Sequence, residues 1–154
     1  MRAMTLPQSH LYRDLPDPER DPAFYADVPS KRLLAWVVDV VVAFGFTLLA
    51  VPLTAFTAIF YFPFLWLLVG FAYRTITIAR GSATWGMRFA GIELRNWRGE
   101  RLDLPQAAMH TGIYTACMTV FPLQIVSVVL MLTTARKQGL PDMALATVAL
   151  NARR

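Results

Sequence analysis

The stretch Val40–Tyr73, VVVAFGFTLLAVPLTAFTAIFYFPFLWLLVGFAY, decides the fold, because it holds no Asp, Glu, Lys or Arg over 34 positions. An uncharged apolar run of about 18 residues or more is typical of a membrane span. A second charge-free stretch covers Leu104–Ala135. The whole chain is 56% hydrophobic and 16% charged, against about 45–50% and about 25% in soluble domains. These features predict an all-α integral membrane protein and exclude a soluble enzyme with one globular core.

The first charge-free block is long enough for two membrane helices, since each crossing needs about 20 residues. Pro52 is the natural break between them. We expect a transmembrane hairpin with helices at about 31–51 and 56–79, joined by a tight turn over 51–55. Arg74 would then lie near the end of the second helix, where its side chain can reach the headgroups.

Two arrangements fit the last apolar block, 107–135. It can form one kinked helix, or it can turn back at Pro122 as a second short hairpin whose arms are closer to re-entrant segments than to full spans. Lys and Arg number five before residue 33, six within 74–101 and four after residue 135, with none in the expected 51–55 turn. By the positive-inside rule the amino terminus is cytoplasmic in a multi-pass inner-membrane protein. The same rule favours the short hairpin, although the length of the block favours one span.

The polar segments lie outside these blocks. Residues 1–30 contain five prolines, which predicts an extended, solvent-exposed cytoplasmic arm. Residues 80–105 form a charged cytoplasmic surface loop, in which the alternation over 92–95 and 97–100 suggests a small hairpin. Alternatively, the Ser82/Thr84 region could cap a short interfacial helix. The spread of positive charge predicts contact with anionic headgroups of the bilayer at the cytoplasmic face, and no nucleic acid.

Asp39 is the formally charged residue that lies deep in an apolar block. It is seven positions, so about 10 Å, beyond Arg32 on the same helical face. An ionised Asp there costs about 2.5–3.5 kcal/mol unless a partner or a proton offsets it. Two interpretations stay open: Asp39 is protonatable and works with Arg32, or it is an interhelical hydrogen-bond partner of Ser, Thr or backbone groups.

Other chemistry lacks a recognisable pattern in the sequence. Cys117 is the single cysteine, and His110 lies seven positions before it with no acid to orient the imidazole. The two histidines come with no carboxylate pattern for a metal. No Gly-rich phosphate loop or dinucleotide fingerprint is present. We therefore expect no enzyme activity, no metal and no cofactor.

The segment Lys31-Arg32-Leu33-Leu34-Ala35-Trp36-Val37-Val38-Asp39 resembles the first-helix signature of the RDD family of small bacterial membrane proteins. The family is named for one arginine and two aspartates. The resemblance assigns the arginine to Arg32 and the first aspartate to Asp39. It covers about residues 24–151 and implies an RDD-like membrane domain at 31–151.

Two further motifs support the resemblance. The segment 80–88, with Gly81, Thr84 and Gly86, is similar to the family's Gly-x-Thr-x-Gly-Lys loop. The segment 138–142, followed by Ala146-Thr147-Val148, resembles the closing motif, which puts the second aspartate at Asp142. The chain departs from the family pattern at three positions, Met87 near the loop Lys, His110 where an Arg often follows, and Pro141 in place of a His.

The family is mostly uncharacterised, and the resemblance implies transport or cation/proton exchange for some members. We therefore expect a transport-type protein in which Arg32, Asp39 and Asp142 form one charge network. The alternative is an accessory or assembly subunit of a larger membrane complex, because two to four helices leave little room for an alternating-access pathway. A complex partner or a homo-oligomer would fit the small residues on the helices.

Overall fold

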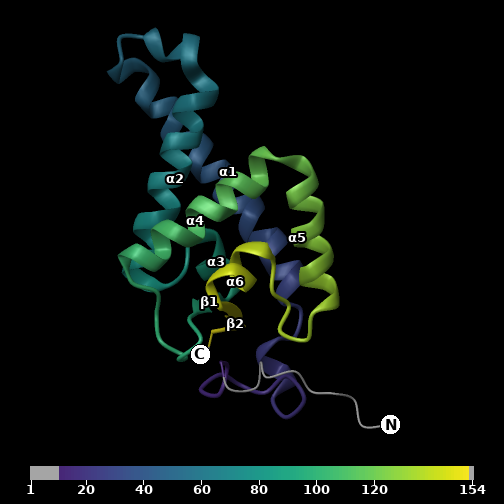
Figure 1. Ribbon diagram of the computed structural model, residues 1–154. Coiled ribbons are helices and arrows are strands. Elements are labelled where there is room, and N and C mark those ends of the chain that lie inside the picture. Colours follow the sequence, from purple (N-terminus) through teal and green to yellow (C-terminus); the bar gives the residue numbers. More distant parts are fainter. Residues whose placement is uncertain (1–10, 153–154) are drawn as a thin grey trace.

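The structure is a computed structural model that describes residues 11–152. Helices make up most of it, and a two-stranded antiparallel sheet lies at the same end of the molecule as the two ends of the described chain (Figure 1). The elements in chain order are η2 (Pro22–Phe24), α1 (Val28–Leu53), η3 (Thr57–Tyr61), α2 (Phe62–Gly81), α3 (Trp85–Ala90), β1 (Ile92–Arg95), α4 (Leu104–Thr119), α5 (Phe121–Thr133), α6 (Leu140–Leu145) and β2 (Val148–Asn151).

Helices α1 and α2 form a long hairpin that projects beyond the other elements (Figure 1). In the described chain, these two helices with their flanking turns are each long and apolar enough to cross a membrane by themselves. The second helical segment begins at Thr57, close to the expected 56, but its first five residues form the 3-10 helix η3 and α2 itself begins at Phe62. Ala55 and Phe56 adopt positive φ angles, which break the helical path, and the helix restarts where Pro63 occupies its first turn.

The last apolar block forms two helices. Helices α4 and α5 are bent by 116° at the break between them, and α5 runs back toward the sheet end of the molecule (Figure 1). Pro122 lies in the first turn of α5, where a missing N–H costs no helical hydrogen bond. A helix pair bent in this way is either a broken span or a re-entrant loop, so both expected arrangements stay open.

The polar loop contributes one strand to a sheet that joins distant parts of the chain. Strand β1 pairs antiparallel with β2, with Ile92 opposite Asn151 and Arg95 opposite Val148. The expected hairpin between 92–95 and 97–100 is therefore wrong. The side-chain oxygen of Asn96 accepts hydrogen bonds from the backbone N–H groups of residues 98 and 100 at 3.0 and 2.9 Å, so this segment curls into a tight turn. Because the chain contains this two-stranded sheet, the expectation of an all-α protein is wrong in this detail.

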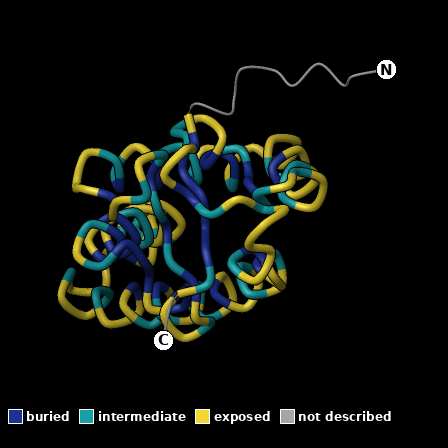
Figure 2. The backbone as a smooth tube through the Cα atoms, turned by 90° about the horizontal axis from the view of Figure 1, so that it is seen from below, coloured by how far each residue is buried: buried dark blue, intermediate teal, exposed yellow. Residues whose placement is uncertain are grey.

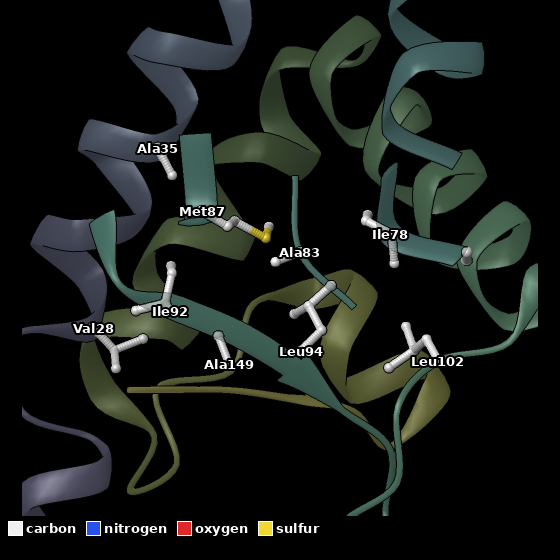
Figure 3. Close-up of a cluster of buried hydrophobic side chains, with 10 residues drawn as sticks. Val28, Ala35, Ile78, Ala83, Met87, Ile92, Leu94, Leu102 and Ala149 are labelled. Atoms are coloured by element: carbon white, nitrogen blue, oxygen red, sulfur yellow. The ribbon is translucent and has the colours of Figure 1, made fainter. Parts of the chain in front are cut away.

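An apolar core lies where α1, α3 and the sheet meet (Figure 3). Helix α3 packs closely on α1, and buried segments run through the middle of the molecule in the view from below (Figure 2). The short α3 begins at Trp85, and the side chain of the preceding Thr84 caps it by accepting from the Met87 N–H at 3.1 Å. This matches the expected cap of a short helix. The core consists of Val28, Ala35, Ile78, Ala83, Met87, Ile92, Leu94, Leu102, Ala107 and Ala149.

The amino-terminal arm is packed against the sheet from residue 11 onward, and the part of the prediction that concerns residues 1–10 lies outside the described residues. Tyr12, Leu15 and Tyr25 are buried in a cluster with Val148 and Leu150 of β2. The expectation of an extended arm is wrong for this part, whereas most of residues 11–27 are exposed, as expected. Its prolines separate short turns, and its apolar side chains cover one face of β2.

Candidate functional site: two buried carboxylate centres

Asp39 lies in the middle of α1 and is only 4% exposed. Its Oδ1 accepts hydrogen bonds from the Tyr73 hydroxyl at 2.8 Å and from the Gly86 N–H at 2.9 Å. Its Oδ2 accepts from the Thr84 hydroxyl at 2.6 Å and from Arg74 Nη1 at 3.1 Å. These donors come from α2 and from the start of α3, so Asp39 ties three helices together. We call these five residues the Asp39 centre.

The loop motif supplies two of these donors because of its residue types. Thr84 uses its oxygen to cap α3 and its proton to bind Asp39. Gly86 lets α3 approach α1, since a Cβ there would collide with the Ala35 carbonyl oxygen and crowd Asp39. Gly81, the third motif residue, ends α2 and lies against the Arg88 side chain instead.

Arg74 is the cation of the Asp39 centre, and the sequence-based expectation that it reaches the headgroups is wrong. Helix α2 continues to Gly81, so Arg74 lies about two turns inside the helix and is buried against α1 and α4. Its guanidinium carbon lies 3.9 Å from the ring centre of Tyr114, a cation–π distance. Its Nε atom has no hydrogen-bond partner among the described residues.

Asp142 forms a second centre and is fully buried. Its Oδ2 accepts from Arg32 Nη1 at 2.5 Å and from the Gly139 N–H at 3.0 Å. Its Oδ1 lies 2.8 Å from His110 Nε2 and accepts from the Thr147 hydroxyl at 3.2 Å. These contacts connect α6 to α1 and α4. We call these five residues the Asp142 centre.

The charge state of Asp142 follows from its neighbours. Burial alone would raise the pKa of this carboxyl, but the Arg32 guanidinium and the His110 hydrogen bond outweigh burial and hold the pKa well below its usual range. Asp142 is therefore ionised at neutral pH. An ionised carboxylate only accepts hydrogen bonds, so His110 donates from Nε2. The other ring nitrogen, Nδ1, is buried and has no partner in the described part of the chain.

The structure divides the expected charge network between the two centres. Arg32 pairs with Asp142, and Asp39 pairs with Arg74. The interhelical interpretation of Asp39, with partners from Thr and backbone groups, matches its observed bonds. Reasoning from the sequence missed Arg74 and His110 as partners. Charge balance could have identified Arg74, since a buried carboxylate such as Asp39 needs a cation beside it. The signal for His110 was that it occupies a position where the family often has an Arg.

Two cavities flank the Asp39 centre. One of about 520 Å³ lies between α1, α4 and α5, and one of about 260 Å³ lies between α1, α2 and α4. Asp39, Arg74, Trp36, Tyr114 and Met118 line both. Arg32 lines the larger cavity as well. The larger cavity thus brings together a charged residue of the Asp142 centre and the ion pair of the Asp39 centre, surrounded by apolar side chains.

Neither centre is a cluster of metal-ligating side chains. Within residues 11–152, no group of three or more His, Cys, Asp and Glu side chains could hold an ion. Both buried carboxylates are instead surrounded by N–H and O–H donors of the protein. Cys117 is a buried free thiol.

Comparison with known proteins gives one match. The model of the RDD family matches residues 27–146, which is most of the chain. Neither a curated protein nor a solved structure matches. The matched segment contains Arg32, Asp39 and Asp142, which are the residues assigned to the family's arginine and aspartates from the sequence motifs.

Proposed function

The chain belongs to the RDD family, and on that premise we propose that it is a transport-type protein that exchanges a cation for a proton across the bacterial inner membrane. The observation that carries the proposal is the 520 Å³ cavity, which Arg32, Asp39 and Arg74 line together. Ionisable side chains within membrane segments are costly and are typical of ion pathways when they line a cavity. Enzymatic chemistry is not part of the proposal.

The Asp39 centre suggests how exchange could be coupled. Arg74 donates a hydrogen bond to the Asp39 carboxylate in this structure, and its guanidinium also lies over the Tyr114 ring. A cation or a proton that arrives through the cavity would compete with Arg74 for Oδ2 of Asp39. The guanidinium would keep its cation–π contact when the carboxylate releases it. Asp39 would bind either a cation or a proton at one time, but never both. Binding of one therefore releases the other, and this competition couples their transport as an exchange.

The placement of the ends supports a cytoplasmic amino terminus. The arm, β1 and β2 lie together at one end of the molecule (Figure 1). Lys31 and Arg136 belong to this end, where Lys31 donates to Asn151 at 2.7 Å and Arg136 lies over the Tyr12 ring. The connection 54–61 at the other end of the α1–α2 hairpin carries no charge. The positive-inside rule then puts the sheet end in the cytoplasm.

Flux in proteoliposomes tests the transport proposal. The wild-type protein should dissipate an imposed pH gradient when Na⁺, K⁺ or Li⁺ is added outside. Asp39→Asn alone strands a buried Arg74, so the informative variant combines Asp39→Asn with Arg74→Gln, which replaces the ion pair by two neutral amides. This double variant should insert and fold but show no exchange. The proposal fails if the wild type shows no flux with any of the three cations, or if the inserted double variant exchanges normally.

A second candidate is an accessory or assembly subunit without transport activity of its own. A specific observation favours it: both oxygens of Asp39 and of Asp142 are already bound by donors of the same chain. Such contacts stabilise the fold and leave no oxygen without a partner for a ligand. Extraction in mild detergent should then recover a stoichiometric partner protein. Recovery of the chain alone, or only as a homo-oligomer, would contradict this role.

A further inference from the structure

The two cavities extend from the Asp39 centre in opposite directions along α1. On this helix the lining of the larger cavity covers 29–39, and it includes Pro141 of α6, which lies near the sheet (Figure 1). The lining of the smaller cavity covers 36–43 of α1 and 66–74 of α2, so it extends toward the tip of the hairpin. The ion pair of the Asp39 centre therefore lies where the two cavities meet.

The larger cavity reaches the surface of the molecule at its sheet end. Ser30 lines this cavity, lies in the first turn of α1 and is exposed. Arg32 also lines it and keeps 12% of its side chain exposed, although its partner Asp142 is fully buried. The polar arm and the sheet lie at the same end (Figure 1). The mouth of the cavity is thus formed in part by polar side chains that solvent can reach.

Polar groups without a protein partner continue deeper into the larger cavity. Gln124 lies in the first turns of the apolar helix α5 and lines the cavity. Its side-chain amide makes no hydrogen bond with any of residues 11–152. Asp39 accepts one of the five N–H donors of Arg74, and the others have no oxygen acceptor within the same residues. An unpaired amide or guanidinium N–H is unfavourable in apolar surroundings, so a molecule in the cavity must supply the acceptors.

Water supplies these acceptors without adding charge. The lining needs no counter-ion, because Arg32 is neutralised by Asp142. Arg74 is neutralised by Asp39 in the same way. Cavities with polar groups on their walls hold water, whereas genuinely empty cavities are apolar. Each water molecule takes about 30 Å³ of liquid volume, so about 520 Å³ has room for a continuous chain of them.

The smaller cavity offers water fewer partners. Beyond the residues that it shares with the larger cavity, its hydroxyl groups all donate within the protein. Those of Thr115 and Thr119 bind backbone carbonyls of α4 at 2.8 and 3.0 Å, and that of Tyr73 binds Asp39. Most of the other lining side chains are apolar, such as Leu67 and Phe71. A cavity of this composition favours the dry state.

We propose that the larger cavity holds a chain of water molecules that connects the cytoplasm with Asp39, and that the smaller cavity is dry and closes the route on the other side. The cytoplasmic direction and the use of this chain as an ion route rest on the proposed function. In the state described here, a proton or a cation reaches Asp39 from the cytoplasm alone. Hydration is measured without transport, so cation flux without a water chain, or a water chain without flux, would separate the two proposals.

Labelling of introduced cysteines tests the water chain. The reagent is a charged methanethiosulfonate that does not cross membranes, and it is applied to inside-out and right-side-out vesicles that contain the full chain. Val128 lines the larger cavity, whereas Val129 is exposed on the same helix and does not line it. Because only the thiolate reacts and apolar surroundings disfavour it, Val128→Cys should react at least about tenfold faster than Val129→Cys in inside-out vesicles. Neither should react in right-side-out vesicles. The wild type, whose Cys117 is buried, gives the background rate.

A third variant tests the dry side. Gly70 lines the smaller cavity, and a Cβ there meets no atom within 4 Å, so Gly70→Cys fits without a collision. It should stay at the background rate in both kinds of vesicle, and labelling from either side would overturn the dry barrier. The water chain is overturned if Val128→Cys reacts no faster than Val129→Cys, or if it reacts only in right-side-out vesicles.

Discussion

Arg32 binds Asp142, which lies 110 positions away in the sequence, through an Nη1–Oδ2 contact of 2.5 Å. Asp39 lies only seven positions further along the same helix, yet it pairs with Arg74 of α2. The two acids thus hold different parts of the fold to α1. Asp39 fixes α2 and α3, and Asp142 fixes the end of the chain, with α4 bound through His110.

The ion pair of the Asp39 centre should show strong coupling in a double-mutant cycle. Arg74→Gln leaves the Asp39 carboxylate without its cation, and removing one member of a buried pair costs about 3–5 kcal/mol. Adding Asp39→Asn should recover a large share of that loss, because two neutral amides can still bond. Thermal unfolding in detergent of the wild type, both single variants and the double variant measures the coupling. Additive losses would show that the two side chains do not interact.

Gly86→Ala should destabilise the fold by about 1–3 kcal/mol, because the new Cβ collides with the Ala35 carbonyl and a packed interface tolerates extra atoms poorly. Gly45→Ala is the control, since a Cβ there meets no atom within 4 Å. That variant should be neutral, or stabilising by about 0.5–1 kcal/mol from reduced backbone freedom. Melting temperatures in the same detergent compare the two. Equal effects would mean that α3 does not lie against α1.

Thr84→Val should cost about 1–3 kcal/mol, because it removes the cap of α3 and a donor to Asp39 while it keeps the side-chain shape. Thr84→Ser keeps the hydroxyl and should stay close to the wild type. Urea or thermal unfolding in detergent distinguishes the variants. If Ser and Val are equally harmful at this position, packing of the methyl group matters and the hydroxyl does not.

Acid should weaken the Asp142 centre below the ordinary pKa of a carboxyl. The pKa of Asp142 is lowered in the folded protein from its usual value of 3.8. The folded state therefore binds fewer protons than the unfolded state, so the stability from this residue is complete above pH 3.8 and is lost as the pH falls through the folded pKa. Melting temperatures measured downward from pH 5 should decline in the wild type. Asp142→Asn should start from a lower stability and decline less, and a parallel decline would contradict the assignment.

A side-sensitive reporter should place both ends of the chain in the same compartment. The arm packs on β2, and β2 pairs with β1, so a reporter after residue 152 should give the same cytoplasmic signal as one before residue 11. A reporter inserted at 54–61, between α1 and α2, is the control and should report the opposite side. Opposite signals at the two termini would mean that α4 and α5 together cross the membrane once.

Much of the fold was predictable because hydropathy is a local property of the chain. The charge-free run Val40–Tyr73 predicts the α1–α2 hairpin without knowledge of any contact. The break in the last block lies where Pro122 predicts it, in the first turn of α5. The start of α2 was less accurate, since η3 and the turn at Ala55 and Phe56 depend on how the chain closes the hairpin.

The sequence by itself determined which segments are apolar, which residues are out of place in them, and which motifs resemble a family. Only the tertiary structure decided which charges pair. Helical spacing puts Arg32 and Asp39 on one face, but seven residues separate them by about 10 Å, too far for a direct hydrogen bond. Each acid therefore binds donors that packing brings from distant segments, such as Arg74 and Thr84 for Asp39 and Arg32 for Asp142. Those distances depend on the arrangement of whole helices, which no local pattern encodes.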